Sequence, residues 1–429
     1  MTDQAEQMLG GLALAGHTVP FEDMPRKVAE CGARAGFFHP WIYVADLQEQ
    51  LLVPLPGQHD GSGQELLPLG IDTTVAGRAF RSVELVPAAA PQDPASGGTP
   101  AAAGPQRGPQ RVWVPLLDGT ERIGVLAITV PGLNEATQLR VRQLAALLAV
   151  ILVSKRQASD TYARLVRTRP MELSAEVLWS LLPQRAFANE RVVISAALEP
   201  AYVVGGDAFD YAVAGDTLHL AIFDAMGHDT AAGLTATLAL AAYRNHRRRD
   251  ADLVEAGEAI DAVIAEQFGQ MRYATAILAT LDMRTGRLTW ANRGHHPPLI
   301  IRRGRVVAVL DAPPDPPMGF NLGAHQPPAG YQLEPGDRLL LYSDGIIEAQ
   351  SPDGQLFGLD RFTDFIIRRE ADGLSAPETL RRLIQTILDH QHGRLQDDAT
   401  VLLVEWRAQQ HFAGPDPANP ASALAPRPR

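Results

Sequence analysis

The segment Phe223-Asp224-Ala225-Met226-Gly227-His228 decides the fold assignment of this chain. It closes the apolar, strand-like run Leu218–Phe223 and precedes Thr230–His246, an Ala- and Leu-rich run that is typical of a helix. A strand that delivers an aspartate into a tight turn fixes its carboxylate and the neighbouring backbone carbonyl, here that of Ala225. Hard divalent cations take such oxygen ligands.

Three further aspartate motifs lie in the second half of the chain, each beside an apolar strand-like run. They are Gly205-Gly206-Asp207, Ser343-Asp344-Gly345 and Asp397-Asp398-Ala399-Thr400. We therefore expect four carboxylates to converge at one edge of a packed sheet, namely Asp207, Asp224, Asp344 and Asp397. Carboxylates packed together repel one another unless cations neutralise them, and oxygen-only ligands suit Mg²⁺ or Mn²⁺. This pattern is what a two-metal hydrolase requires.

The composition bounds the class of protein. A chain of 429 residues predicts two or three domains. Its 38 Lys and Arg against 49 Asp and Glu leave a formal charge of −11, which disfavours nucleic-acid and anionic-membrane partners. The single cysteine, Cys31, excludes an intramolecular disulfide framework and a thiolate metal cluster.

No membrane or secretion signal is expected from the sequence. The segment Met1–Gly10 carries acids and lacks the basic-then-apolar pattern of a signal peptide. The longest fully apolar stretch, Leu144–Val153, is about half of the roughly 20 residues that a membrane helix needs. We therefore predict a cytoplasmic protein.

The first part of the chain has the pattern of a small α/β domain. The predicted elements are a helix at Met24–Ala35, strands at Trp41–Ala45 and Leu51–Leu55, and a hairpin of Arg111–Leu116 and Ile123–Val130 across Asp118-Gly119. The Pro-, Ala- and Gly-rich segment 87–110 is predicted to be a disordered loop.

This pattern resembles a GAF-type sensory domain over about the first 155 residues. The resemblance rests on the helix, the paired strands ending in VWVPLLDGTERIGVLAITV (Val112–Val130) and the long helix that follows. It implies a small-molecule ligand whose identity the sequence does not reveal.

The stretch Glu135–Thr168 contains no Gly or Pro and predicts one long helix that ends before Pro170. Its apolar positions are Leu144, Leu148, Ile151, Leu152, Leu165 and Val166. They could form a seam between two protomers or pack the helix against its own domain. We favour a connecting helix that also forms a homodimer.

Six ordered segments of the second half resemble the bacterial branch of the metal-dependent PPM serine/threonine phosphatases, the sporulation stage II E-like (SpoIIE-like) group. They are Ser180–Gln184 (SLLPQ), Val203–Asp210 (VVGGDAFD), Phe223–His228 (FDAMGH), Ala291–Pro298 (ANRGHHPP), Leu339–Ala349 (LLLYSDGIIEA) and Asp397–Thr400 (DDAT). The resemblance covers about Leu178 to Trp406.

The resemblance implies an α-β-β-α sandwich of two antiparallel sheets flanked by helices, with two Mn²⁺ or Mg²⁺ ions at one end. Asp224 would bridge both ions, and Ala225 would contribute its carbonyl. Asp344 and Asp397 would hold one ion, with Asp207 beside the other. A hydroxide generated by the ions would attack phosphorus in line, so that no protein nucleophile is required.

The resemblance also implies a substrate and leaves an alternative. The substrate would be phosphoserine or phosphothreonine on a partner protein, a phosphorylated anti-sigma factor antagonist, with the sensory domain regulating the reaction. The alternative is a catalytically inactive sensor-scaffold that acts by protein contact alone. The four retained aspartates favour the enzyme.

Several polar residues near the motifs have two interpretations. His228 could be a metal ligand or part of a structural turn, and we favour the turn. His295 and His296 are predicted to shape a loop beside Pro297. Asp229, where the resembling family has a small residue, could cap the following helix or alter the charge of the site, and the cap is favoured.

Three further alternatives concern charged residues. Asp398 is predicted to lie behind the metal ligands, although it could share metal binding with Asp397. Arg293 could hold the phosphate, as an arginine does in eukaryotic relatives of the resembling family, or lie on the surface, which is favoured. The cluster Arg244–Arg249 could bind an anion or could be a solvated helix end stabilised by the helix dipole, which is favoured.

The predicted organisation is α+β. It comprises a GAF-like sensory domain (1–134), helical linker or regulatory helices (135–184), a SpoIIE-like phosphatase domain (185–407) and a disordered tail (408–429).

Overall fold

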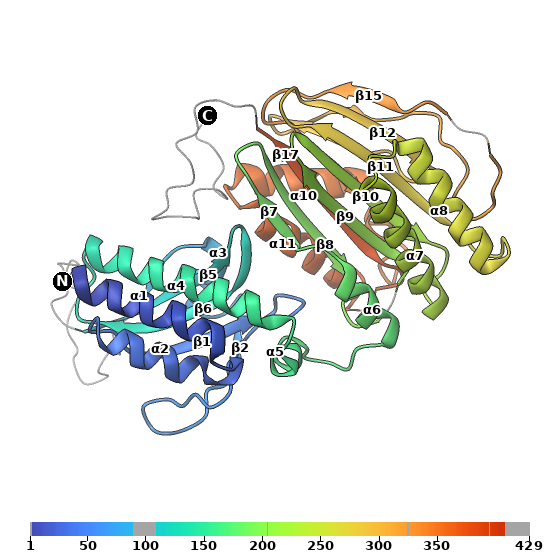
Figure 1. Cartoon of the computed structure of the whole chain (residues 1–429). Helices are drawn as coiled ribbons and strands as arrows, with labels where there is room; N and C mark the ends of the chain where they lie inside the picture. The colour runs from blue at the N-terminus through green and yellow to red at the C-terminus, as the bar shows by residue number, and fades with distance from the viewer. Residues whose placement is uncertain (1, 89–108, 204, 324–325, 394, 408–429) are drawn as a thin grey trace. The chain divides into compact units, whose positions relative to one another are not determined.

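The computed structural model describes residues 2–88, 109–203, 205–323, 326–393 and 395–407 (Figure 1). These residues divide into two compact units, one that ends at Thr168 and one that begins at Arg169. The predicted disordered tail 408–429 and most of the predicted loop 87–110 lie outside the described residues. The two ends of that loop, Pro87 and Gln110, belong to strands.

The first unit is built on a six-stranded antiparallel sheet with the strand order β3-β2-β1-β6-β5-β4. Its strands are β1 (Phe38–Ala45), β2 (Leu51–Pro54), β3 (Leu69–Gly70), β4 (Val86–Pro87), β5 (Gln110–Asp118) and β6 (Glu121–Val130). The β5–β6 hairpin turns at Gly119, whose φ of 58° is one that glycine adopts without strain. The hairpin predicted across Asp118-Gly119 is confirmed.

Helices cover both faces of this sheet. The described helices are α1 (Thr2–Thr18), the 3₁₀ turn η1 (Phe21–Asp23), α2 (Met24–Ala33), α3 (Val75–Ser82), α4 (Glu135–Arg156) and α5 (Asp160–Val166). Residues of α1, α2 and α4 share one apolar core with one face of the sheet. Residues of α3 pack with Tyr43, Trp113 and Val125 in a second core. The sheet is therefore buried on both sides.

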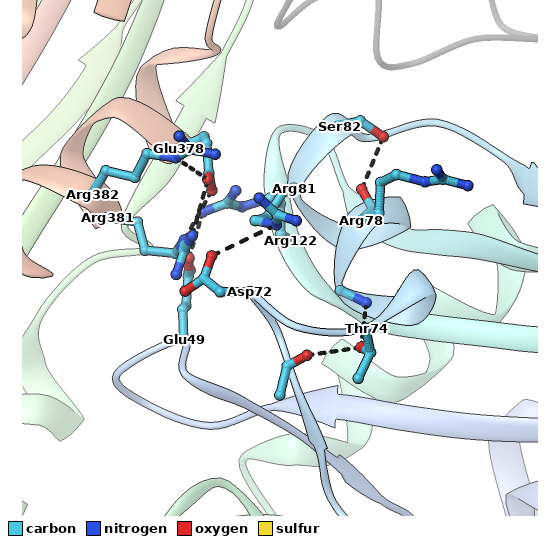
Figure 2. A network of polar contacts seen from close by, with 12 residues as sticks. Glu49, Asp72, Thr74, Arg78, Arg81, Ser82, Arg122, Glu378, Arg381 and Arg382 are labelled. Atoms are coloured by element: carbon cyan, nitrogen blue, oxygen red, sulfur yellow. Dashed lines mark hydrogen bonds and ion pairs between the residues drawn. The ribbon is translucent and has the colours of Figure 1, made fainter.

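Polar contacts determine where α3 begins (Figure 2). The Thr74 Oγ1 atom accepts the backbone N–H of Gly77 at 3.1 Å and donates to the Gly70 carbonyl at 2.7 Å. A side-chain acceptor at this position satisfies one of the free N–H groups of a helix N-terminus. Within the same unit, Arg122 pairs with Glu49 and Arg81 lies 3.7 Å from Asp72.

The long helix predicted at Glu135–Thr168 is two helices. It breaks after Arg156 because the Ser159 hydroxyl accepts the N–H of Tyr162 at 3.1 Å and caps a new helix, α5. All the apolar positions of the predicted seam pack within the core of the first unit: Leu144, Leu148, Ile151, Leu152, Leu165 and Val166. The seam between protomers is therefore wrong for these positions, because their own sheet buries them. The alternative, in which the helix packs against its own domain, agrees with these positions.

By length and composition alone, α4 could cross a membrane. Its apolar residues are nevertheless core residues of the first unit, including Val141, Leu144 and Leu148, which have no exposed surface. A packed core helix accounts for this composition.

The second unit contains two antiparallel sheets. The five-stranded sheet has the order β15-β12-β11-β10-β9, and the six-stranded sheet has the order β14-β13-β16-β17-β8-β7. The strands are β7 (Ala186–Ala188), β8 (Val192–Glu199), β9 (Asp207–Ala214), β10 (Thr217–Ala225), β11 (Ala274–Asp282), β12 (Arg287–Arg293), β13 (Leu299–Arg302), β14 (Arg305–Val309), β15 (Ala329–Gln332), β16 (Arg338–Tyr342) and β17 (Ala399–Trp406).

The two sheets face each other, and helices cover their outer faces (Figure 1). The helices of this unit are α6 (Leu173–Leu181), α7 (Thr230–Arg247), α8 (Leu253–Phe268), α9 (Asp344–Ile347), α10 (Leu359–Ala371) and α11 (Ala376–His390). Side chains of α7 and α8 pack on the five-stranded sheet, and those of α9, α10 and α11 pack on the six-stranded sheet. The predicted α-β-β-α sandwich is confirmed.

The sequence of β10 explains why this strand is central. Leu218, Leu220 and Ile222 face the core between the sheets, whereas Ala221 and Phe223 face the core under α7 and α8. A strand with apolar side chains on both alternating faces must be covered on both sides. It carries Asp224 directly to the end of the sandwich.

Candidate metal centre

Two of the predicted site residues lie opposite each other on neighbouring strands. Asp207 begins β9 and pairs in register with Asp224 near the end of β10. The backbone N–H of Ala225 donates to the Gly206 carbonyl at 2.9 Å, which extends the same ladder. Antiparallel pairing therefore brings Asp207 and Asp224 together at one end of the five-stranded sheet.

The six-stranded sheet supplies the other carboxylates. Asp344 follows β16 as the first residue of α9, and Asp397 and Asp398 precede β17. The Ser343 N–H donates to the Thr400 carbonyl at 3.0 Å, and the Thr400 N–H donates to Ser343 Oγ at 3.0 Å. These bonds continue the β16–β17 ladder up to the aspartates.

A hydrogen bond joins the two groups across the sheets. The backbone N–H of Asp207 donates to Asp398 Oδ2 at 3.1 Å. Asp398 thus supports the backbone of Asp207, while the Asp398 N–H donates to Asp397 Oδ1 at 2.9 Å. The structure brings together Asp207, Asp224, Asp344 and Asp397, with Asp398 between the two sheets.

Three glycines permit this close approach. A Cβ atom on Gly205 would lie 1.1 Å from the Asp398 carboxylate, and one on Gly206 would lie 1.9 Å from the Ala225 carbonyl oxygen. A Cβ atom on Gly345 would lie 1.9 Å from the Asp398 carbonyl oxygen. Real Cβ atoms do not approach this closely. Glycine is therefore required for packing at Gly206 and Gly345, where backbone atoms are in the way, and at Gly205 a larger residue would displace the Asp398 carboxylate.

Without a bound cation, burial and mutual repulsion disfavour the ionised form of these carboxylates. Burial, followed by the charge of Asp224, raises the pKa of Asp207 well above its usual 3.8. Burial and the charges of Asp344, Asp397 and Asp398 raise the pKa of Asp224 to about 7. Burial also raises the pKa of Asp398 to about 7, and burial followed by the charge of Asp397 raises that of Asp344.

These residues fit a divalent cation. The Oδ2 atom of Asp207 is buried without a hydrogen-bond partner, a state that costs about 1–3 kcal/mol or more for a charged group. A cation would satisfy this oxygen and offset the repulsion among the carboxylates. Oxygen donors of this kind suit Mg²⁺ or Mn²⁺.

Two possible ligands beside Asp344, His296 and Glu348, were not predicted as metal ligands from the sequence. The ligand atoms of His296, Asp344 and Glu348 all lie within 4.8 Å of one another. Glu348 occurs four residues after Asp344, and its N–H donates to the Asp344 carbonyl at 2.7 Å, so one helical turn brings the two side chains to the same face. A pocket of about 180 Å³ adjoins them and is lined by Asp344, Glu348 and Asp397, among others.

His295 braces the two sheets behind the aspartates. Its Nε2 atom lies 3.1 Å from the Tyr342 carbonyl oxygen, and its Nδ1 atom lies 2.8 Å from Thr275 Oγ1. A carbonyl can only accept, so Nε2 carries the proton and Nδ1 accepts from the threonine hydroxyl. Burial lowers the pKa of His295 to about 3, so the ring is neutral at pH 7. The predicted loop histidine is a structural link between sheets.

His228 and Asp229 lie in the turn between β10 and α7. His228 is exposed and follows Gly227, whose φ of 86° forms the turn. The Asp229 Oδ1 atom accepts the Ala232 N–H at 2.8 Å and caps α7, so the predicted cap is confirmed.

The prediction for Arg293 is wrong. Its side chain is buried, and its Nη1 atom lies 3.5 Å from the Asp315 carboxylate, which is buried as well. The guanidinium passes under α8 where Gly257 has no side chain, since a Cβ atom there would lie 2.4 Å from Arg293 Nη2. In the sequence, the only hint of this packing was Gly257, because a glycine inside a helix can mark the close approach of another group.

Part of the arginine cluster Arg244–Arg249 has a structural role. Arg244 Nη2 and Arg247 Nη2 lie 2.6 Å and 2.9 Å from the carboxylate of Asp210, which is fully buried. Neither the anion patch nor the solvated helix end describes these two arginines. They neutralise an aspartate that the sequence places on the apolar strand β9.

The sandwich of two antiparallel sheets, with acidic residues gathered at one end, defines the class of PP2C-like metal-dependent phosphatase domains. Residues 214–407 match the family model of stage II sporulation protein E (SpoIIE). This part of the chain is therefore similar to SpoIIE-type phosphatase domains. Phosphatases of this class depend on metal ions, commonly Mn²⁺ or Mg²⁺.

Similar proteins match about half of the chain. Protein IcfG from Synechocystis sp. is 24% identical over 266 residues, which cover 54% of this chain and 41% of that protein. The phosphoserine phosphatase RsbU from Bacillus subtilis is 24% identical over 239 residues, covering 54% of this chain and 69% of that protein. The solved SiaA-PP2C domain of Pseudomonas aeruginosa is 21% identical, with a TM-score of 0.45, covering 54% of this chain and 94% of that domain. The chain thus spans less than half the length of the first of these relatives.

The raised pKa values predict how stability depends on pH without divalent ions. Between about pH 4 and pH 7 the folded protein holds protons on Asp224 and Asp398 that the unfolded chain has lost, so the free energy of unfolding falls as pH rises. In EDTA we expect the melting temperature to drop by on the order of 5 °C across this range. Saturating Mn²⁺ should remove most of this drop at pH 7. A metal-free melting temperature that stays constant over this range would contradict the cluster.

Proposed function

We propose that the second unit is a metal-dependent protein serine/threonine phosphatase. The observation that carries the proposal is the convergence of Asp207, Asp224, Asp344 and Asp397 around a buried carboxylate oxygen that lacks a partner. The match of residues 214–407 to the SpoIIE family supports it.

In this proposal two Mn²⁺ or Mg²⁺ ions would bind at the end of the sandwich. Asp224 would be a ligand of both ions, and the Ala225 carbonyl would contribute a further oxygen. Asp344 and Asp397 would hold one ion, with Asp207 beside the other. The ions would supply a hydroxide nucleophile near neutral pH and neutralise charge on the phosphoryl group.

The protein contributes position and electrostatics. Asp398 holds the backbone of Asp207 through the 3.1 Å bond to its N–H, so Asp207 reaches the site with a fixed backbone. His295 ties the strand that carries Tyr342 to the strand opposite Asp224. A carboxylate set held from both sheets is organised before any ion binds, which lowers the cost of ordering it.

We propose as substrate a phosphoserine or phosphothreonine on a partner protein, an anti-sigma factor antagonist in the cytoplasm. The similarity to a phosphoserine phosphatase supports this class of substrate. We propose further that the first unit is a GAF-like sensory domain that regulates the second. Its six-stranded antiparallel sheet, covered on both faces by helices, supports this assignment.

The test is phosphate release by the purified full-length chain. With Mn²⁺, we expect release from a phosphoserine antagonist protein at a rate at least about a hundredfold above that with EDTA. A chain that releases no phosphate and shows no tight Mn²⁺ site by calorimetry would instead be the sensor-scaffold. Activity that is unchanged on removal of residues 1–168 would contradict regulation by the first unit.

A further inference from the structure

The loop Met226–Asp229 links the metal-site end of β10 to α7. It follows Asp224 and Ala225 without an intervening residue. Its first residue extends the β10–β11 ladder, because the Met226 N–H donates to the Tyr273 carbonyl at 3.0 Å. Its second residue is Gly227 at a φ of 86°, and glycine restricts the backbone less than any other residue because it has no Cβ atom.

A single arginine, Arg272, which lies just before β11, holds this loop. Arg272 Nη1 donates to the Met226 carbonyl at 3.1 Å, and Arg272 Nη2 donates to Asp229 Oδ2 at 2.6 Å. One planar guanidinium therefore grips both ends of the loop. Arginine suits this task because its donors have a fixed geometry, which the single ammonium of lysine lacks.

The arginine is itself held in place. Its backbone carbonyl packs against Gly319, where a Cβ atom would lie 2.3 Å away. The neighbouring Met318 and Ala274 exchange two backbone hydrogen bonds of 2.8 Å. The backbone next to Arg272 is thus fixed by its contacts with Met318 and Gly319, whereas the loop that Arg272 holds contains the flexible Gly227.

Asp229 serves two purposes with its two oxygens. The Oδ1 atom caps α7 through the Ala232 N–H, and the Oδ2 atom pairs with Arg272. The side chains of Arg272 and Asp229 are 21% and 59% exposed, and ion pairs in contact with solvent contribute little to stability. The pair therefore matters for the position of the loop rather than for the stability of the fold.

We propose that Arg272 is a positioning residue that fixes the Met226–Asp229 loop, and through it the Asp224 carboxylate and the Ala225 carbonyl, in the arrangement that receives a divalent cation. The inference rests on the proposed metal-dependent function. Without Arg272, the loop samples arrangements that cannot bind the ion, and the apparent affinity falls in proportion to the fraction that can.

The variants that test this are made in the full-length chain. Arg272→Met removes both contacts and keeps an apolar stem of similar length. Asp229→Asn removes the charge but keeps the helix cap, since asparagine caps as well as aspartate. Arg368→Met is the matched control, because Arg368 forms an exposed pair with Asp364 on α10 in the same unit.

Two measurements are made on each variant. Calorimetry should show that Arg272→Met raises the Kd for Mn²⁺ about tenfold and Asp229→Asn about threefold, with Arg368→Met unchanged. Hydrogen exchange in EDTA should show faster exchange of the loop amides in Arg272→Met. At saturating Mn²⁺ the kcat should return to near the wild-type value, with KM for the phosphoprotein within about twofold of wild type.

The outcomes separate the two proposals. Unchanged Mn²⁺ affinity and loop exchange in Arg272→Met would overturn the positioning role. A raised KM with unchanged Mn²⁺ affinity would also overturn it and would assign Arg272 to the substrate phosphate. If the wild-type chain binds no Mn²⁺, the proposed function fails; the exchange measurement, made without metal, still decides whether Arg272 holds the loop.

Discussion

Asp224→Asn is expected to lower Mn²⁺-dependent phosphate release by at least about a thousandfold while the protein stays folded. Asparagine has the size of aspartate but carries no charge, so it cannot hold two cations together. The metal-free variant should also melt at a higher temperature than wild type at pH 7, since burial and three neighbouring carboxylates destabilise the ionised Asp224. Loss of activity with increased stability would show that Asp224 is retained for chemistry.

The measurements are hydrolysis of a small aryl phosphate and of a phosphoserine peptide, together with thermal melting in EDTA. Asp364→Asn is the matched control, because it removes a carboxylate that is 64% exposed on α10. It should leave activity and melting temperature nearly unchanged. If Asp224→Asn hydrolyses these substrates at the wild-type rate, Asp224 has no role in the reaction.

Gly206→Ala is expected to raise the Kd for Mn²⁺ by at least about a hundredfold and to lower the free energy of unfolding by about 3 kcal/mol. The new Cβ atom would lie 1.9 Å from the Ala225 carbonyl oxygen. Because both groups belong to backbones paired by a 2.9 Å hydrogen bond, no side-chain rotation relieves the clash. The ends of β9 and β10 must separate, which moves Asp207 away from Asp224.

Calorimetry with Mn²⁺ and urea unfolding measure the two effects. Gly132→Ala is the control, since its added methyl group meets nothing within 4 Å. If Gly206→Ala loses stability but binds Mn²⁺ with wild-type affinity, the Ala225 carbonyl does not belong to the site.

The strands that carry the aspartates were predictable because the relevant signals are local. The run Leu218–Phe223 is apolar on one face and, apart from His219, on the other, which favours a strand covered on two sides. Asp224 comes directly after this run, and Asp344 comes directly after β16. A strand followed at once by an aspartate places that residue at the end of a sheet whatever the rest of the chain does.

The errors share one cause. Arg293 was expected at the surface, and the apolar face of α4 was expected between protomers, but each is buried against a segment distant in sequence. A glycine in α8 makes room for Arg293, and the sheet of the first unit covers α4. Charge and periodicity show that a side chain needs a partner and do not show which surface provides it.

The sequence by itself predicted the strand ends that carry the four aspartates and the oxygen ligands of a divalent cation, because strand periodicity and oxygen chemistry act over a few residues. The sandwich was implied by the resemblance of the motifs to a known family. Only the tertiary structure decided which groups meet. Asp398 supports Asp207 from the other sheet, Glu348 joins His296 beside Asp344, and Arg272 grips the loop after Ala225. These contacts depend on distances between segments far apart in the chain, and packing of the two sheets sets those distances.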